Sequence, residues 1–365
     1  MANGRVTATS LNLCDAPNGA VIGQLRNGDS LAIIETKDDW LSVSAIVGGA
    51  TKLGWVNAKF VDIIDSGPPP ADDDATPVTV VAGKAIGPDG RSFASVHQGG
   101  FFTLGVTTVD NWLAGNPAGL SLAPSLIRVV RAVSRNEGRL EAINSYDNSF
   151  LSFGMFQWTA GAGNQPGELA GLLALVQRSS ADAFQQYFGR YGLGTELQRG
   201  ARTGFLTLAG AMLNDATDKE QLRGAEWAYR FWRAGQDDTV RACELNLAAA
   251  RVPLFLQAPV AGHVVGDWLS SEYGVALVLD EHVNRPGHVP GTLKTAIDGL
   301  APGADPTTWG DQEEAELIRR YIAARAATNM TDPANRATSI GDCVSAGAMS
   351  DKRGSFAATP AAPSV

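Results

Sequence analysis

The chain has few cysteines and no long apolar run. Its 365 residues include three cysteines, Cys14, Cys243 and Cys343, which lie far apart and are odd in number. This spacing does not indicate a disulfide framework. Three thiols are typical of a chain that is made in the cytoplasm and folds without oxidation. Because no run of 18 apolar residues occurs, we expect no membrane insertion.

Positive charge is also scarce. The chain has 29 Lys and Arg against 38 Asp and Glu, which gives a formal net charge of −9 at pH 7. A nucleic-acid binder usually carries a basic face, and no basic run occurs in this sequence. We therefore expect no nucleic-acid partner, and we expect a monomer.

The composition of the chain indicates a multi-domain organisation. Residues 1–65 contain short alternating runs separated by turns such as PNG and NGD, a pattern typical of a small all-β barrel. Residues 66–80, SGPPPADDDATPVTV, predict an extended linker. The rest is rich in Ala and Leu, and we expect a mainly α domain with a short β-hairpin over residues 81–345. A flexible tail is expected over residues 346–365.

One segment, residues 125–159, carries the strongest chemical signal. Its first part is apolar at near-helical spacing after Pro124, so it predicts a helix that ends near Glu137 and stops at Gly138. The residues that follow supply turn chemistry, and FLSFGMFQW is aromatic enough for a strand. Glu137 is therefore expected at the end of a buried helix, with Asp147 on a hairpin beside it.

Two carboxyl groups in such different surroundings suit glycosidic hydrolysis. One carboxyl must stay protonated to donate to the leaving oxygen, and the other must stay ionised to activate water. We expect the apolar helix end to raise the pKa of Glu137 by desolvation, and we expect a hydrated hairpin to leave Asp147 as the ionised partner.

The pattern E-G-x8-D-x4-S-F-G-x2-Q, from Glu137 to Gln157, resembles the core of the lysozyme-like superfamily of glycan hydrolases. It is similar to the phage-type lysozymes, in which Glu, Asp and Thr are followed by a Gly-rich strand. It also resembles the chitosanase and goose-type branches, in which Glu ends a helix and a G-x-x-Q strand follows. Here the Glu-to-Asp gap is one residue longer than in the phage type, and Ser152 stands for Thr one place early.

The resemblance implies a role for each matching residue. Glu137 is the acid, Asp147 the water-directing carboxylate, Ser152 its hydroxyl partner and Gln157 a substrate contact. Further candidates for substrate binding are Tyr146, Phe153, Trp158 and Arg285. We expect no cofactor and no metal site, since the His and acidic residues near position 282 have a weak spacing for metal ligands.

Residues 1–65 carry a second resemblance, to bacterial SH3-like domains. The opening Leu11-Asn12-Leu13 followed by Pro17 and the closing Gly54-Trp55-Val56 are similar to that family's L-N-x-R-x-x-P and G-W-V, with Cys14 where arginine is usual. The resemblance implies attachment to cell-wall peptides or glycan.

Together these features predict a peptidoglycan hydrolase, a muramidase or lysozyme that cleaves β-1,4 bonds by acid/base catalysis with inversion. A chitosanase or chitinase of the same fold stays open, and the acidic charge favours it. A lytic transglycosylase and a non-catalytic wall-binding protein also stay open. The start, MANGRVTATS, does not read as a signal peptide, so we expect synthesis in the cytoplasm and release to the cell wall by lysis or a dedicated secretion system. A chain that starts after a removed signal is the alternative.

Overall fold

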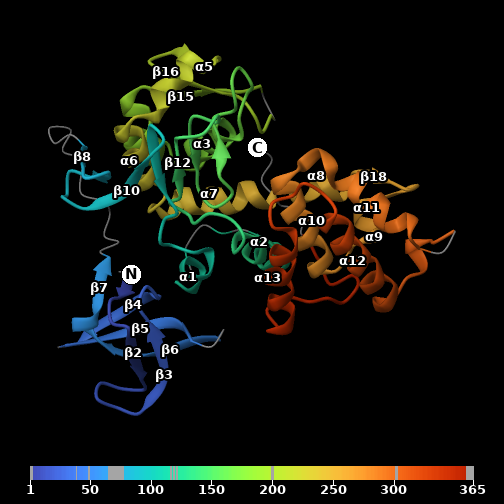
Figure 1. Cartoon of the computed structure of the whole chain (residues 1–365), viewed down its shortest axis with the longest axis horizontal. Helices are drawn as coiled ribbons and strands as arrows, with labels where there is room; N and C mark the ends of the chain where they lie inside the picture. The colour runs from blue at the N-terminus through green and yellow to red at the C-terminus, as the bar shows by residue number, and fades with distance from the viewer. Residues whose placement is uncertain are drawn as a thin grey trace.

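The computed structural model describes residues 3–64, 78–198, 201–300 and 303–358, apart from positions 38, 48, 49, 116, 118, 119 and 121. The chain begins with a β region and continues into a mainly helical region, as Figure 1 shows in its change from blue to red. This order confirms the prediction of β structure followed by α structure.

The N-terminal region is one antiparallel sheet with its own core. Its strands follow the order β3-β2-β6-β5-β4-β1-β7. Their bounds are β1 (Asn3–Val6), β2 (Ser10–Cys14), β3 (Val21–Arg26), β4 (Ser30–Lys37), β5 (Trp40–Val47), β6 (Ala50–Asn57) and β7 (Val61–Ile64), with a 3-10 turn η1 (Ala58–Phe60) before β7. Alternating apolar side chains such as Leu13, Leu25 and Leu41 are fully buried between the strands, separately from the second core.

A second seven-stranded sheet contains the predicted hairpin. Its strands pair in chain order, from β8 at one edge to β14 at the other. They are β8 (Thr79–Val81), β9 (Lys84–Ile86), β10 (Ser92–His97), β11 (Gly100–Thr103), β12 (Ile143–Asn144), β13 (Ser152–Phe153) and β14 (Trp158–Thr159). The sequence predicted only a short hairpin, and the structure extends it with four strands that precede α2. Strand β8 starts inside the predicted linker, and residues 66–77 of that linker lie outside the described residues.

The helices build the rest of the molecule. Two of them, α1 (Val109–Ala114) and α2 (Pro124–Ser134), lie between β11 and β12 in the chain. The others are α3 (Glu168–Ser179), α4 (Ala181–Tyr187), α5 (Ala216–Lys219), α6 (Ala225–Ala234), α7 (Asp238–Ala249), α8 (Val252–Leu256), α9 (Val265–Trp268), α10 (Glu272–Asn284), α11 (Val289–Asp298), α12 (Asp311–Ala326) and α13 (Pro333–Ser345).

Short elements complete the description of the helical region. A three-stranded sheet is formed by β15 (Leu193–Glu196), β16 (Phe205–Leu208) and β17 (Ala211–Met212), and a hairpin by β18 (Pro259–Val260) and β19 (His263–Val264). The 3-10 turns are η2 (Gly189–Tyr191), η3 (Glu220–Arg223), η4 (Pro286–His288) and η5 (Pro306–Thr308).

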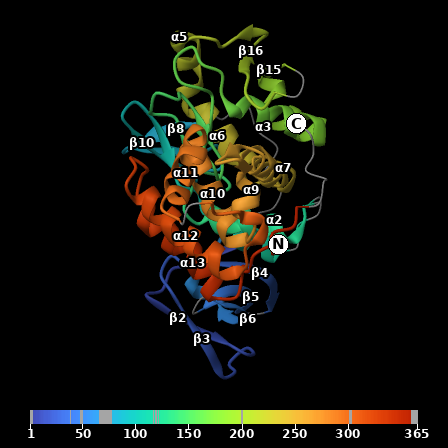
Figure 2. The ribbon, with the colours of Figure 1, turned by 90° about the vertical axis from the view of Figure 1, so that its right-hand side faces the viewer.

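Helix α2 is the element on which the site is built. Its apolar side chains Leu126, Val129, Val130 and Val133 are at most 2% exposed. It packs against α7, α10 and α13, so segments far apart in the sequence meet around it. Figures 1 and 2 show α13 and α10 beside α2 in both views. Among the described helices, none is both long enough and apolar enough to cross a bilayer.

The C-terminal segment corrects the predicted flexible tail. Sequence composition predicted flexibility from residue 346, but Met349 is 5% exposed and the backbone N–H of Phe356 donates to the carbonyl of Ser270 at 3.0 Å. The side chain of Arg353 donates to buried Glu314 at 2.6 Å. Residues 346–358 are therefore part of the packed structure, because their polar groups find partners on other elements. Residues 359–365 lie outside the described residues.

Candidate active site

Glu137 lies directly after the buried helix, as the sequence predicted. Helix α2 ends at Ser134, and one more turn follows, in which the N–H of Asn136 donates to Val133 and that of Glu137 to Ser134. The apolar helix fixes the position of this turn against the core. The carboxyl group of Glu137 is thereby held at a rigid helix end, with its side chain 14% exposed.

Two side chains from the C-terminal helices hold the Glu137 carboxylate. Arg336, on α13, forms an ion pair with its Oε1 atom. Asn284, the last residue of α10, donates from Nδ2 to the same oxygen at 3.2 Å. The acid is thus fixed in orientation by groups that are about 150 and 200 residues away in the chain.

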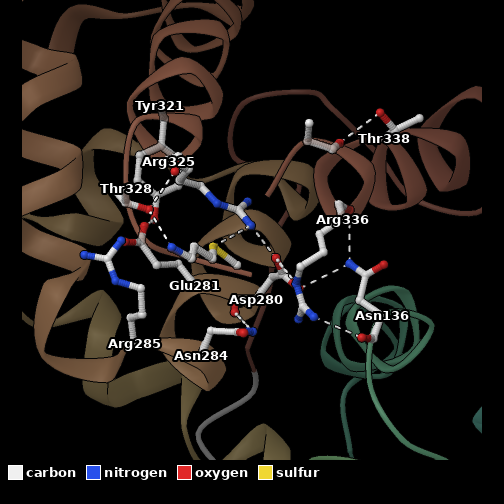
Figure 3. A network of polar contacts seen from close by, with 12 residues as sticks. Asn136, Asp280, Glu281, Asn284, Arg285, Tyr321, Arg325, Thr328, Arg336 and Thr338 are labelled. Carbon is white, nitrogen blue, oxygen red and sulfur yellow. Dashed lines mark hydrogen bonds and ion pairs between the residues drawn. The ribbon is translucent and has the colours of Figure 1, made fainter. Parts of the chain in front are cut away.

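Arg336 belongs to a row of alternating charges. Its guanidinium donates to Oδ1 of Asp280 at 2.7 Å, and Asp280 also forms an ion pair with Arg325. Asp280 is fully buried and Arg325 is 1% exposed. In Figure 3 Arg336 lies between Asp280 and Asn136, with Arg325 on the other side of Asp280. The row is neutral when Glu137 is ionised and carries one positive charge when Glu137 is protonated.

Asn136, the neighbour of Glu137, binds the same arginine from the turn that follows α2. The carbonyl of Asn136 accepts a hydrogen bond of 3.0 Å from Nη1 of Arg336. Its side-chain amide donates to Asp280 at 3.2 Å and to the carbonyl of Arg336 at 3.0 Å. The guanidinium is therefore held on several sides, so Arg336 has little freedom to follow Glu137 if that side chain moves.

Burial decides the ionisation of Glu137. Desolvation raises the pKa of the Glu137 carboxyl, and the negative charge of Asp280 raises it further, while the charge and hydrogen bond of Arg336 and the hydrogen bond of Asn284 lower it. The net result is a pKa above the ordinary value for glutamate. This is the shift that a group donating a proton requires.

The G-x-x-Q turn packs against Gly138, the residue after Glu137. A Cβ atom on Gly138 would lie 3.2 Å from Nε2 of Gln157 and 3.1 Å from the carbonyl oxygen of Gly154. The absence of a side chain at Gly138 therefore lets the β13–β14 turn approach its backbone closely. Gln157 has a positive φ of 50°, and its Nε2 donates to the Gly154 carbonyl at 2.9 Å. The structure thus places the Gln157 amide beside Gly138 and holds it in one orientation.

The buried carboxyl group of Glu244 binds the backbone of this turn. Oε2 of Glu244, on α7, accepts a hydrogen bond of 2.8 Å from the N–H of Met155, and a side chain on Gly154 would collide with it. Burial raises the pKa of Glu244 well above its ordinary value. Sequence reasoning missed this residue, although its spacing of four from Val240 and three from Leu247 places it on the buried face of α7.

Asp147 lies on the loop between β12 and β13. Its Oδ2 accepts from Nδ2 of Asn144 at 2.8 Å, and its Oδ1 accepts from the N–H of Ser149 at 2.8 Å. The side chain is half-buried. Both hydrogen bonds are local, so the short loop sequence itself fixes the carboxylate.

The predicted partner of Asp147 is corrected. Ser152 is 3% exposed on β13, directly opposite Asn144 on β12. Among the described residues no hydrogen bond joins Ser152 to Asp147, and Asn144 takes that place. Sequence reasoning missed this pair, because Asn144 reads only as one of several turn-forming residues before β13.

Two predicted substrate contacts are core residues. Phe153 is fully buried, with its ring 5.2 Å from that of Phe231, and Trp158 is 1% exposed and packs at 5.8 Å on Phe156. Both face the helices because they lie opposite each other on β13 and β14. Their side chains cannot reach a sugar in this structure, so we remove them from the binding set.

The other two predicted substrate contacts, Tyr146 and Arg285, lie in different surroundings. Tyr146 is half-buried and touches the rings of His97 and Phe102, at centroid distances of 4.3 and 6.2 Å. Arg285 follows Asn284, but its Nη1 lies 3.8 Å from buried Glu281 and its side chain is 15% exposed. In Figure 3 Arg285 lies on the Glu281 side of the network, away from Arg336.

The acidic and histidine residues at the end of α10 have separate partners. Asp280 binds the two arginines described above, Arg325 and Arg336. Glu281 accepts hydrogen bonds from Tyr321 at 2.5 Å and Thr292 at 2.6 Å. His282 packs on Phe255, and burial together with two nearby arginines lowers its pKa to about 4. Within the described ranges, no group of three or more His, Cys, Asp or Glu side chains is arranged to hold a metal ion.

No protein-family model matches the chain, and no curated protein matches it.

Proposed function

We propose that the protein is a glycoside hydrolase that cleaves β-1,4 bonds in an amino-sugar polymer, with peptidoglycan as the first candidate substrate. The observation that carries the proposal is the state of Glu137. A carboxyl group at the end of an apolar helix is largely buried, is fixed by Arg336 and Asn284, and has a raised pKa. A glycosidase acid needs this combination of position and protonation.

The proposed reaction uses two carboxyl groups. Glu137 donates its proton to the glycosidic oxygen as the bond from that oxygen to the anomeric carbon breaks. Asp147 accepts a proton from a water molecule that attacks the anomeric carbon from the opposite face, which inverts the configuration. Inversion requires the two carboxyl groups to be roughly 6.5–9.5 Å apart, whereas a separation near 5 Å belongs to a covalent mechanism. In this scheme Asn144 orients Asp147, since it holds one carboxylate oxygen at 2.8 Å.

Arg336 has a defined place in the scheme. A lone arginine beside Glu137 would keep the carboxylate ionised and prevent proton donation. Asp280 compensates that charge, because it binds the same guanidinium at 2.7 Å and is fully buried. After proton transfer, Arg336 and Asn284 stabilise the Glu137 anion that remains. In this scheme Arg336, Asp280 and Asn284 therefore allow Glu137 to be either protonated or ionised.

The N-terminal region completes the proposal. Its separate core supports an independent module, and we propose that it is an SH3-like domain that attaches the enzyme to the cell wall. Cys14, where the resemblance would place arginine, is 6% exposed and pairs with Trp55 across β2 and β6. In this proposal the protein acts on the bacterial cell wall, outside the cytoplasm.

A second candidate substrate is favoured by charge. The net charge of −9 suits a cationic polymer such as chitosan better than anionic peptidoglycan. The site chemistry at Glu137 is the same for both polymers. Peptidoglycan and chitosan are therefore two candidate substrates for the same proposed glycosidase activity.

Product analysis tests the proposal. The purified protein is incubated with peptidoglycan and, separately, with chitosan, and the products are analysed by reducing-end assay and mass spectrometry. We expect hydrolytic products with free reducing ends from at least one polymer. Products with anhydro ends would indicate a lytic transglycosylase, and binding without any products would indicate a non-catalytic wall-binding protein; either result contradicts the proposal.

A further inference from the structure

The second sheet carries an exposed aromatic group on the strands that the sequence did not predict. Phe102 on β11 is 41% exposed, and His97 at the end of β10 is also exposed. Tyr146 makes edge-to-face contacts with both rings. We call Phe102, His97 and Tyr146 the aromatic platform. Aromatic rings that touch one another and stay partly exposed form a continuous surface, which a ligand with an apolar face can cover.

The strand register places the platform on one face of the sheet. Ser95 pairs with Phe102, and His97 pairs with Gly100, so the side chains at 95, 97 and 102 point to the same side. The next residue, Phe101, points to the other side and packs against the main core. The platform therefore lies on the outer face of the sheet, opposite the face on which Phe101 packs against the core.

Gly100 lets Tyr146 join the platform. A Cβ atom on Gly100 would lie 2.4 Å from the carbonyl oxygen of Ser145 and 2.7 Å from Cα of Tyr146. Without that side chain, the backbone of residues 145 and 146 lies directly on β11. The hydroxyl of fully buried Ser145 accepts from the N–H of Phe101 at 2.9 Å, and Arg223 donates to the Ser145 carbonyl at 2.7 Å. The ring of Tyr146 is thus held in place before any ligand arrives.

The platform continues into the candidate active site. Tyr146 is the residue before Asp147, and Asn144, which binds Asp147, pairs with Phe102 across β11 and β12. On the other side of Phe102, Ser95 accepts a hydrogen bond of 2.9 Å from Lys84, its partner on β9. The exposed ring therefore lies between polar groups on both neighbouring strands. Rings bordered by hydrogen-bonding groups suit a pyranose, which has an apolar C–H face and a polar rim.

We propose that the aromatic platform is an additional sugar-binding subsite, which holds the glycan chain on the Asp147 side of the bond to be cleaved. This inference rests on the proposed function, because the occupant that it names is the glycan backbone of the proposed substrate. The four strands β8 to β11 extend the sheet beyond the predicted hairpin, and in this proposal they lengthen the binding surface for a polymer.

The test compares two exposed residues on opposite faces of one hairpin. Phe102→Ala removes the platform ring, and Val96→Ala is the matched control, because Val96 is 40% exposed and pairs with Phe101 rather than with the platform. Both variants are made in the full chain, and unchanged thermal unfolding shows that they fold. Binding of peptide-free glycan strands from peptidoglycan, and of chitohexaose, is measured by calorimetry.

We expect Phe102→Ala to weaken glycan binding by about three- to tenfold, in line with the worth of one aromatic contact. Val96→Ala is expected to change it by less than twofold. On a polymer that the protein cleaves, Phe102→Ala should raise KM with little change in kcat, because the ring contributes binding and not proton transfer.

Two outcomes overturn the subsite. One is equal binding by Phe102→Ala and Val96→Ala when the wild-type protein binds either glycan. The other is a wild-type protein that binds neither glycan. If the wild-type protein binds glycan and cleaves none, the proposed function fails, while a loss of binding in Phe102→Ala still supports the platform. The binding and turnover measurements therefore separate the two proposals.

Discussion

Asp280 accepts a hydrogen bond of 2.7 Å from the same guanidinium nitrogen of Arg336 that pairs with Glu137. The buried aspartate and the candidate acid thus compete for one positive charge. The more strongly Asp280 binds the Arg336 guanidinium, the less that guanidinium stabilises the ionised form of Glu137. Burial raises the pKa of Glu137 most, and Asp280 raises it further although it need not contact the substrate.

Glu137→Gln should abolish turnover, since glutamine keeps the shape of the side chain but has no proton to donate. We expect a loss of at least about 1,000-fold in kcat, at the scale of a general acid. Reducing-end release from the active polymer measures it. Unchanged thermal unfolding and unchanged binding to cell walls serve as controls, and wild-type turnover in this variant would rule out Glu137 as the acid.

Asp280→Asn and Arg336→Met should shift the pH profile in opposite directions. Activity falls as pH rises through the pKa of Glu137, because the acid must be protonated. Asp280 raises this pKa and Arg336 lowers it. The basic limb of kcat/KM should therefore move to lower pH in Asp280→Asn and to higher pH in Arg336→Met.

Asp280→Asn is also expected to lower the stability of the fold. Asp280→Asn leaves buried Arg325 without its counterion, and we expect a loss of about 3–5 kcal/mol in the free energy of unfolding. The pH profile is therefore recorded at a temperature at which urea titration shows both variants to be folded. Shifts of the same sign would contradict the proposed compensation.

Asp147→Asn should reduce kcat by several orders of magnitude if the enzyme is an inverting hydrolase. The amide cannot accept the proton of the attacking water, although it keeps the hydrogen bond to the N–H of Ser149. Steady-state kinetics on the cleaved polymer measure the effect. Asp182→Asn, at an exposed aspartate in the first turn of α4, is the control. Full activity with anhydro products would instead indicate a transglycosylase, which needs no second carboxylate.

Glu244→Gln should make stability less dependent on pH. Burial raises the pKa of Glu244 in the folded protein, so the folded state keeps a proton that the unfolded state loses above its ordinary pKa. Stability due to this group is present below that pKa and is lost as pH rises toward the higher folded value. Glutamine still accepts from Met155 and has no charge to bury.

Urea unfolding at pH 5 and pH 8 checks this prediction. The wild-type protein should lose more stability than Glu244→Gln between the two values. Glu244→Leu should be destabilised at both, because the N–H of Met155 would then have no acceptor. An identical pH dependence in the wild type and Glu244→Gln would show that Glu244 does not titrate as described.

Local patterns in the sequence determined the parts that depend on near neighbours. The apolar spacing of Leu126 to Val133 was enough to predict helix α2 with Glu137 after it, because helix formation depends on residues three and four apart. The Asp147 loop is likewise fixed by contacts within three residues. The order of a β region before a helical region followed from alternating and Ala-rich stretches.

Only the tertiary structure decided what surrounds these residues. Helix α13 was not predicted, although Pro333 is a common first residue of a helix, and it brings Arg336 to Glu137 across 199 positions. The aromatic content of residues 150–158 predicted a strand but not that Phe153 and Trp158 face the core. Alternation shows that two faces differ, and only the packing of distant elements shows which face is covered. In the same way, the burial that raises the pKa of Glu137 and the charges of Arg336 and Asp280 that adjust it come from helices whose meeting place no local pattern encodes.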